Sequence, residues 1–112
     1  MQMITAQRKV TVIRPSGHFN ASNAAELQEH LTAVVNKAER GSVLLVNLEQ
    51  VESMDSAGLM TLVQGLRLAQ SLQKRFSLCS VSPSIKIIFE LTGLDSVFEI
   101  FDSPVAFEAA IA

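Results

Sequence analysis

A short polar stretch near the middle of the chain carries the residues best suited to chemistry. It contains the carboxylate of Asp55 and the hydroxyls of Ser53 and Ser56, and two small residues, Ala57 and Gly58, follow. An aspartate or serine before a helix commonly caps it by accepting hydrogen bonds from unpaired backbone N–H groups. The same N–H groups and the positive end of the helix dipole stabilise a phosphate. The stretch therefore indicates either helix capping or phosphorylation of Ser56, with little bulk beside the hydroxyl to block an incoming active site.

A serine at a strand-to-helix turn is also the position of the nucleophile in many hydrolases, but the motif for that chemistry is missing. The pattern G-x-S-x-G requires glycine at position 54, where this chain has Met54. The five glycines have neither the spacing of G-x-x-x-x-G-K nor that of G-x-G-x-x-G, the two common nucleotide-binding patterns. We therefore expect a protein that is not an enzyme, with no catalytic residues and no cofactor.

The residue types that most often bind metals are isolated along the chain. His18 and His30 have no partner ligands at metal-like spacing, and Cys79 lies in an apolar run with no second cysteine. We expect a surface position for both histidines, a core position for Cys79 and no metal site.

The composition is that of one folded domain spanning residues 1–112. The hydrophobic fraction of 48% favours a packed core over disorder. Nine basic and eleven acidic residues give a net charge of -2 without a block of like charge, so nucleic acid is not an expected partner. The chain lacks an apolar run of membrane-spanning length, and its N-terminus lacks the features of a secretory signal. We expect a cytoplasmic protein with no direct membrane insertion.

The hydrophobic pattern alternates between strand-like and helix-like segments. The apolar run at 43–48 is typical of a central strand covered on both faces. Further strands are predicted at 3–7, 9–14, 76–81 and 97–101, and helices from Ala21 to Gly41, after Asp55-Ser56, from Ser82-Pro83 to Gly93, and from Ser103-Pro104 onward. This order, ββαβαβαβα, predicts an α/β fold. We expect four helices on a mixed, mostly parallel sheet of about five strands, with an antiparallel N-terminal hairpin turning near Gln7-Arg8.

The second predicted helix has a core face and an outer face. The core face repeats at three- and four-residue spacing through Leu59, Leu62, Val63 and Leu66. The outer face carries Met60, Gln64, Arg67, Leu68 and Ser71. Because this face begins beside Ser56, its residues are candidate contacts for a partner protein. Gly58 and Gly65 lie on one stripe, which is typical of close helix packing.

Residues 43–59, which read V-L-L-V-N-L-E-Q-V-E-S-M-D-S-A-G-L, resemble the signature of the STAS family, the anti-sigma factor antagonist domains. The likeness covers nearly the whole chain. It includes the early turn from Ser16 to Asn20 before a helix, and the late segment Leu91 to Leu94 followed by Val97-Phe98. Each motif is weak alone, but together they are fairly specific.

The resemblance implies that Ser56 is a phosphate acceptor, within a phosphosite loop formed by Ser53, Met54, Asp55, Ala57 and Gly58. A serine-kinase anti-sigma factor would phosphorylate it, and a PP2C-type phosphatase would remove the phosphate. The unmodified protein, a monomer when free, would bind the kinase and free a sigma factor, and the phosphorylated form would dissociate. This implies partner switching in bacterial transcription regulation.

Three positions depart from the family pattern. Asn20 stands where many members carry an aspartate near the acceptor loop, and Asn47 replaces an acidic residue near the end of the central strand. Both changes remove negative charge, so a phosphate would be less repelled if these residues lie near Ser56. Ala57 replaces a second hydroxyl, which leaves Ser53 as a weaker acceptor candidate. Asn20 joins Met60, Gln64 and Arg67 as a candidate partner contact.

The alternative is a STAS module that binds without being phosphorylated, as part of a larger signalling complex or a transporter. Such a module would associate stably with its complex, whereas a switching antagonist would be recovered free or bound to a soluble kinase. The retained Asp55-Ser56 pair favours switching.

Overall fold

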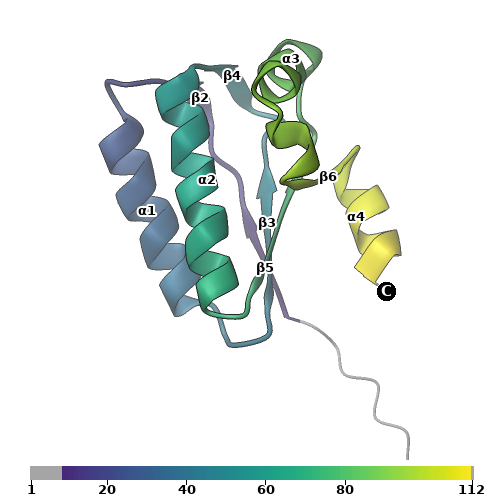
Figure 1. The fold of residues 1–112 in the computed structure, drawn as a ribbon. Helices are drawn as coiled ribbons and strands as arrows, with labels where there is room; N and C mark the ends of the chain where they lie inside the picture. Colours follow the sequence, from purple (N-terminus) through teal and green to yellow (C-terminus); the bar gives the residue numbers. More distant parts are fainter. Residues whose placement is uncertain (1–8, 112) are drawn as a thin grey trace, which may run out of the picture.

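The computed structural model describes residues 9–111, which fold into one α/β unit (Figure 1). The elements follow in the order β1 (Val10–Ile13), β2 (Gly17–Phe19), α1 (Ala24–Lys37), β3 (Val43–Asn47), β4 (Val51–Met54), α2 (Ser56–Ser71), β5 (Arg75–Cys79), α3 (Pro83–Thr92), a 3-10 turn η1 (Leu94–Ser96), β6 (Glu99–Phe101) and α4 (Pro104–Ile111). Within this range, no helix combines the length and the apolar character that a membrane span requires.

The main sheet has the strand order β1-β3-β5-β6, and all of its pairs are parallel. A second, two-stranded sheet pairs β2 with β4, also in parallel. The α/β class and the mostly parallel sheet are therefore confirmed. The predicted element order is wrong at β2 and β4, because these strands are too short and too polar to give a strand pattern. The first predicted hairpin strand, 3–7, and its turn at Gln7-Arg8 lie outside the described residues.

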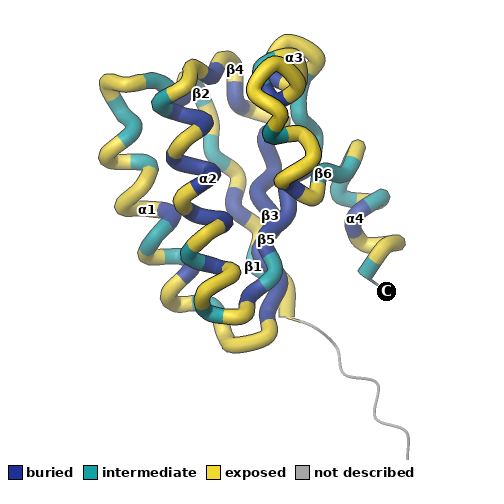
Figure 2. The backbone as a smooth tube through the Cα atoms, in the orientation of Figure 1, coloured by how far each residue is buried: buried dark blue, intermediate teal, exposed yellow. Residues whose placement is uncertain are grey.

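The two faces of the main sheet are covered unequally. All five residues of β3 are buried, which confirms it as a central strand. Leu44 and Val46 belong to a large cluster with residues of α1, α2 and α3, whereas Val43 and Leu45 belong to a smaller cluster that includes Phe107 of α4. Figure 2 shows the buried central strands between the α1–α2 pair and α4.

Specific residues set the helix ends near the middle of the fold. The Ser82 side chain accepts a hydrogen bond from the Ile85 backbone N–H, and Pro83 occupies the first turn of α3, as expected. Gly93 ends α3 with a left-handed φ of 74°, which glycine adopts without a Cβ penalty. Helix α1 ends earlier than predicted, at Lys37, and Gly41 lies instead in the turn before β3 with φ 80°.

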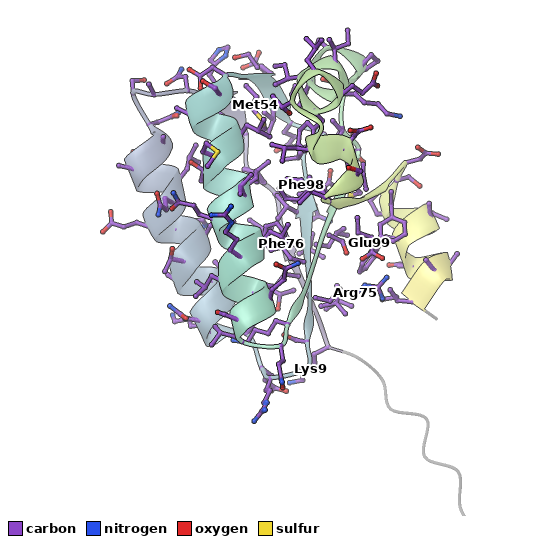
Figure 3. The ribbon with its side chains drawn as sticks, viewed as in Figure 1. Lys9, Met54, Arg75, Phe76, Phe98 and Glu99 are labelled. Atoms are coloured by element: carbon purple, nitrogen blue, oxygen red, sulfur yellow. The ribbon has the colours of Figure 1, made fainter. Side chains whose placement is uncertain are left out.

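A polar network fastens the edge strand β6 to β5. Arg75, which lies beside Glu99 in Figure 3, donates from Nε to Glu99 Oε1 at 2.7 Å. The Ser77 hydroxyl donates to the same oxygen at 2.6 Å. Hydrogen bonding to Arg75 lowers the pKa of the Glu99 carboxyl below its ordinary value, although partial burial acts in the opposite direction. The network therefore adds polar contacts to the packing of Ile100 and Phe101 in holding this three-residue strand in register.

Candidate functional site

Asp55 joins three segments at the start of α2. Its Oδ1 accepts a hydrogen bond from the Gly58 backbone N–H at 3.0 Å, which makes Asp55 the N-cap of the helix. Its Oδ2 accepts from the Ala21 backbone N–H at 3.2 Å, and its own backbone N–H donates to the Phe19 carbonyl at 2.9 Å. Capping is therefore confirmed for Asp55, and the same carboxylate holds the loop before α1 against the start of α2.

Ser56 is the first residue of the 16-residue helix α2, and it is exposed. Its hydroxyl is accessible to a second protein. A phosphate on this hydroxyl would lie beside the unpaired N–H groups of the first turn and at the positive end of the helix dipole. The geometry thus provides backbone stabilisation for an anion, while Asp55 contributes a neighbouring negative charge.

Gly58 allows α2 to pack closely against β2. It is buried, and a Cβ at this position would lie 2.5 Å from the Phe19 carbonyl oxygen and 2.6 Å from the Phe19 Cβ. The packing role expected for Gly58 is therefore confirmed. Glycine allows the first turn of α2 to approach the backbone of β2. Gly65 meets the expected packing role, because a Cβ there would lie 3.2 Å from the Phe76 ring.

Replacing Gly58 with alanine should destabilise the protein by about 1–3 kcal/mol, because the clash is with backbone and not with a flexible side chain end. Urea unfolding monitored by circular dichroism measures the change. Gly65→Ala is the matched control and should cost less, because an aromatic ring can shift by a few tenths of an ångström. Equal stability of Gly58→Ala and the wild type would contradict the close approach of α2 to β2.

Ser53 is paired with His18 across the β2–β4 sheet. The Ser53 hydroxyl lies 2.6 Å from His18 Nδ1, and His18 Nε2 lies 3.7 Å from a carboxylate oxygen of Glu52. All three side chains are exposed, so His18 is a surface residue as expected. The pairing could not be predicted because it depends on two unpredicted strands. The hydroxyl of Ser53 is thus hydrogen-bonded to the His18 ring, whereas Ser56 is exposed at the start of α2.

The two asparagines have different surroundings. Asn20 is half-buried beside the site, since its neighbours Phe19 and Ala21 both bond to Asp55. Its Oδ1 accepts from the Ser22 backbone N–H at 3.0 Å, which shapes the loop before α1. Asn47 is buried, and its Oδ1 accepts from the Glu49 backbone N–H at 3.0 Å. Asn47 therefore fixes the turn between β3 and β4.

The outer face of α2 agrees with the prediction at four of five positions. Met60, Gln64, Arg67 and Ser71 are exposed. Gln64 also accepts a hydrogen bond from Gln28 of α1. Leu68 is half-buried and packs against the large cluster, so its predicted outward position is wrong.

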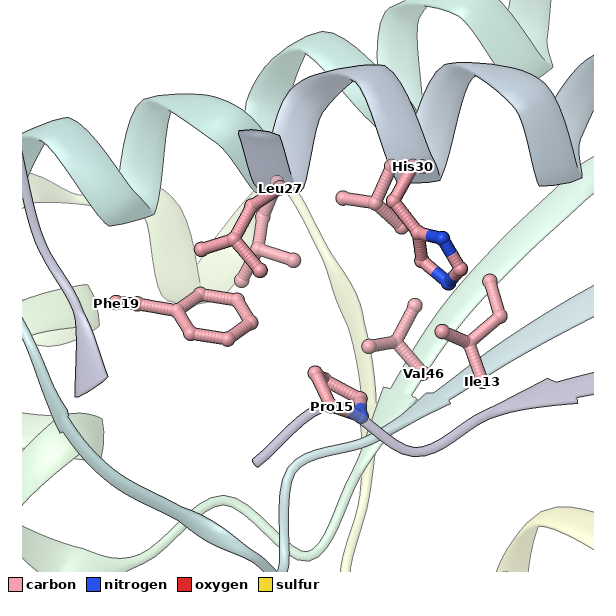
Figure 4. A pocket seen from close by; sticks show the side chains of 8 residues that line it. Ile13, Pro15, Phe19, Leu27, His30 and Val46 are labelled. Atoms are coloured by element: carbon pink, nitrogen blue, oxygen red, sulfur yellow. The ribbon is translucent and has the colours of Figure 1, made fainter. Parts of the chain in front are cut away.

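An apolar pocket lies between α1 and the β1–β2 segment. Figure 4 shows His30 and Leu27 facing Ile13, Pro15 and Val46, with Phe19 at one side. Its volume of about 10 Å³ is close to the minimum for one water molecule, so a cofactor does not fit there. Among residues 9–111, no cluster of histidine, cysteine, aspartate or glutamate has an arrangement that could hold a metal. Cys79 is buried in the smaller cluster, as predicted.

Comparison with known proteins assigns the chain to a family. The STAS domain model matches residues 2–106. The anti-sigma-B factor antagonist of Staphylococcus aureus is 32% identical over 96 residues, which cover 86% of this chain and 87% of that protein. The structure of an anti-sigma factor antagonist from Mycobacterium paratuberculosis superposes with a TM-score of 0.80 at 24% identity, covering 98% and 92% of the two chains.

The Bacillus protein SpoIIAA shares the fold in two states. Its unphosphorylated form, an anti-sigma factor antagonist, has a TM-score of 0.65 at 21% identity, and the match covers 98% of this chain and 93% of that chain. Its phosphorylated form has a TM-score of 0.65 at 20% identity and covers 97% of each chain. With the family model over almost the full length and the identity to the Staphylococcus aureus protein, these matches lead to one conclusion: this chain belongs to the STAS domain family.

Proposed function

We propose that this protein is an anti-sigma factor antagonist that is switched by phosphorylation of Ser56. The observation that carries the proposal is the exposed Ser56 at the first position of α2, directly after the capping residue Asp55. The Staphylococcus aureus relative supports antagonism, because it is named for that role. SpoIIAA supports switching, because the same fold is known in an unphosphorylated and a phosphorylated form.

The unmodified protein binds a serine-kinase anti-sigma factor in the cytoplasm and thereby frees the sigma factor. In the complex, the Ser56 Oγ attacks the γ-phosphorus of ATP held by the kinase. The new O–P bond forms as the bond to the β-phosphate oxygen breaks, ADP leaves, and the hydroxyl proton passes to a base of the kinase. A PP2C-type phosphatase hydrolyses the phosphoserine and restores the binding form.

The residues around Ser56 take different parts in this cycle. Asp55 positions the hydroxyl by capping α2 and holding the 20–23 loop. Asn20 borders the acceptor within that loop, and Met60, Gln64 and Arg67 present exposed side chains along α2. These four residues contact the partner, and the antagonist acts as a monomer.

The direct test is phosphate transfer in a purified system. The protein is incubated with ATP and each serine-kinase anti-sigma factor of its source organism, and mass spectrometry locates any added phosphate. We expect one phosphate on Ser56, none on Ser56→Ala, and unchanged incorporation in Ser53→Ala, the matched control. Absence of phosphate with every kinase, together with stable recovery in a larger complex or a transporter, would replace this proposal with a constitutive binding module.

A further inference from the structure

The His18 ring lies between a hydroxyl and a carboxylate at the end of the molecule that carries Ser56. Its Nδ1 is 2.6 Å from the Ser53 hydroxyl oxygen, and its Nε2 is 3.7 Å from a carboxylate oxygen of Glu52. The Asn23 side chain also donates to the His18 backbone carbonyl. The side chain is 59% exposed, so the ring is held at both nitrogens and still exchanges protons with solvent.

An irregularity in the pairing of β2 with β4 brings both partners to the ring. Gly17 pairs with Val51, but His18 pairs with Ser53, so β4 has one extra residue, Glu52, at this point. Successive side chains of a regular strand point to opposite faces, and a bulge interrupts this alternation. Glu52 and Ser53 are both exposed and both reach the imidazole. The contact therefore follows from the register of the two strands.

Protonation changes the charge of the ring without removing either contact. A neutral imidazole with its proton on Nε2 accepts from the Ser53 hydroxyl at Nδ1 and faces Glu52 with an N–H group. The imidazolium donates at both nitrogens, so it forms an ion pair with the Glu52 carboxylate, and the Ser53 oxygen becomes an acceptor. Histidine is the side chain that commonly changes charge between pH 5 and 8. The position therefore suits a response to pH.

The charged residues around His18 are mostly acidic. Strand β2 contacts β4 and α2, and β4 also contacts α3. The charged residues on these three elements, just before α2 and in the first turn of α1 are Glu26, Glu52, Asp55, Lys86, Glu90 and Arg67. Arg67 lies three turns along α2 from Ser56, and the charges of Lys86 and Glu90 on α3 offset each other. Protonation of His18 therefore reduces a net negative charge beside the acceptor.

Ser56 is close enough to His18 for this charge to act on it. The Asp55 backbone N–H donates to the Phe19 carbonyl at 2.9 Å, so the residue after His18 is bonded to the residue before Ser56. Figure 1 shows β2 and β4 beside the start of α2. The Cα atoms of Ser53 and Ser56, three positions apart, are separated by at most about 11 Å. This is comparable to the Debye length of about 8 Å at physiological ionic strength, so salt weakens the interaction without abolishing it.

We propose that His18 is a proton-binding site coupled to Ser56, so that a lower pH favours the phosphorylated form. The imidazolium offsets the charge of Glu52 and stabilises the phosphate that Ser56 receives. Because such coupling is reciprocal, the phosphate in turn favours protonation of His18. This inference rests on the proposed function and adds to it a response to pH. The antagonist is phosphorylated to a greater extent in mildly acidic than in alkaline conditions.

The coupling is tested without a kinase, on protein into which phosphoserine is incorporated at position 56 during translation. Phosphorus NMR follows the second ionisation of the phosphate, which occurs near pH 6. His18→Gln should move this ionisation to higher pH by at least about 0.2 pH unit at about 10 mM salt, because a cation that favours the dianion is lost. His18→Lys, which keeps a positive charge throughout, should not move it upward.

His30→Gln is the matched control. Its ring faces Ile13 and Val46 beside α1 and not the acceptor loop (Figure 4). This substitution should move the phosphate ionisation by less than about 0.1 pH unit, because the distance is larger. Thermal unfolding should show that all three variants keep the fold.

The two proposals fail separately. If His18→Gln leaves the phosphate ionisation unchanged, or if His18→Gln and His18→Lys both move it upward, the coupling is overturned and the antagonist function stands. If no serine-kinase anti-sigma factor of the organism phosphorylates the wild-type protein, the antagonist function fails. The regulatory role of His18 then fails with it, even where NMR detects the interaction with the incorporated phosphate.

Discussion

Phosphorylated at Ser56, the protein should bind its anti-sigma factor at least about 100-fold more weakly than the unmodified form, a loss of about 2.7 kcal/mol. The phosphate adds about 1.5 to 2 negative charges to a hydroxyl at the centre of the proposed contact. Asp55 lies beside it, and Glu52 belongs to the same end of the molecule. Moving this charge out of water into a close contact is unfavourable unless the partner supplies cations at that point.

Titration calorimetry on enzymatically phosphorylated, purified protein measures the difference. Circular dichroism should be unchanged, because the hydroxyl is on the surface and Asp55 continues to cap α2. Ser56→Asp should weaken binding by less, since one carboxylate carries less charge than a phosphate and has fewer acceptor oxygens. Equal affinity of the phosphorylated and unmodified forms would falsify the switch, even if Ser56 is the modified residue.

Leu45→Ala should lower the free energy of unfolding by roughly 2–5 kcal/mol, the range for removing a buried leucine side chain from a packed core. Leu45 is 2% exposed on the central strand, in the cluster that also contains Val43, Cys79 and Phe107. This cluster is small, so few neighbours can move to fill the cavity. Denaturant unfolding at equilibrium measures the loss.

The neighbouring strand provides a control for this substitution. Val12 pairs directly with Leu45 across the β1–β3 register but is 43% exposed. Val12→Ala should therefore change the stability by no more than about 0.5 kcal/mol. A Leu45→Ala variant as stable as Val12→Ala would contradict a central, doubly covered β3.

The main elements could be predicted because their signals are local. The apolar run of β3, the helical spacing in α2 and the Ser82-Pro83 start of α3 each depend on neighbouring residues only. The short strands β2 and β4 could not be predicted, because three or four residues that include polar side chains become strands only through mutual pairing. The final strand β6 is also shorter than predicted, because the backbone N–H groups of Val97 and Phe98 donate to the Leu94 carbonyl of the 3-10 turn and not to β5.

The site was predictable in its residue types but not in its contacts. Asp55 as a cap follows from its position before a helix, whereas its bond to Ala21 joins segments 34 positions apart. The need for glycine at position 58 also arises from a distant segment, since the atoms that a Cβ would meet there belong to Phe19. The His18–Ser53 pair likewise depends on the register of β2 against β4. Each of these contacts joins residues far apart in the sequence, so it depends on the tertiary structure and not on the local sequence pattern.

The unequal cover of the sheet divides the molecule into two units of different local stability. The smaller cluster depends on α4, an eight-residue helix, whereas the large cluster is shared by three longer helices. Segments with few apolar contacts open at lower free energy than the rest of a domain. Opening of α4 would expose Cys79, whose burial raises the pKa of its thiol, while α1, α2 and α3 stay packed. On the proposed function, we therefore expect the acceptor end to stay native while α4 opens, and partner binding at Ser56 to persist when α4 is locally unfolded.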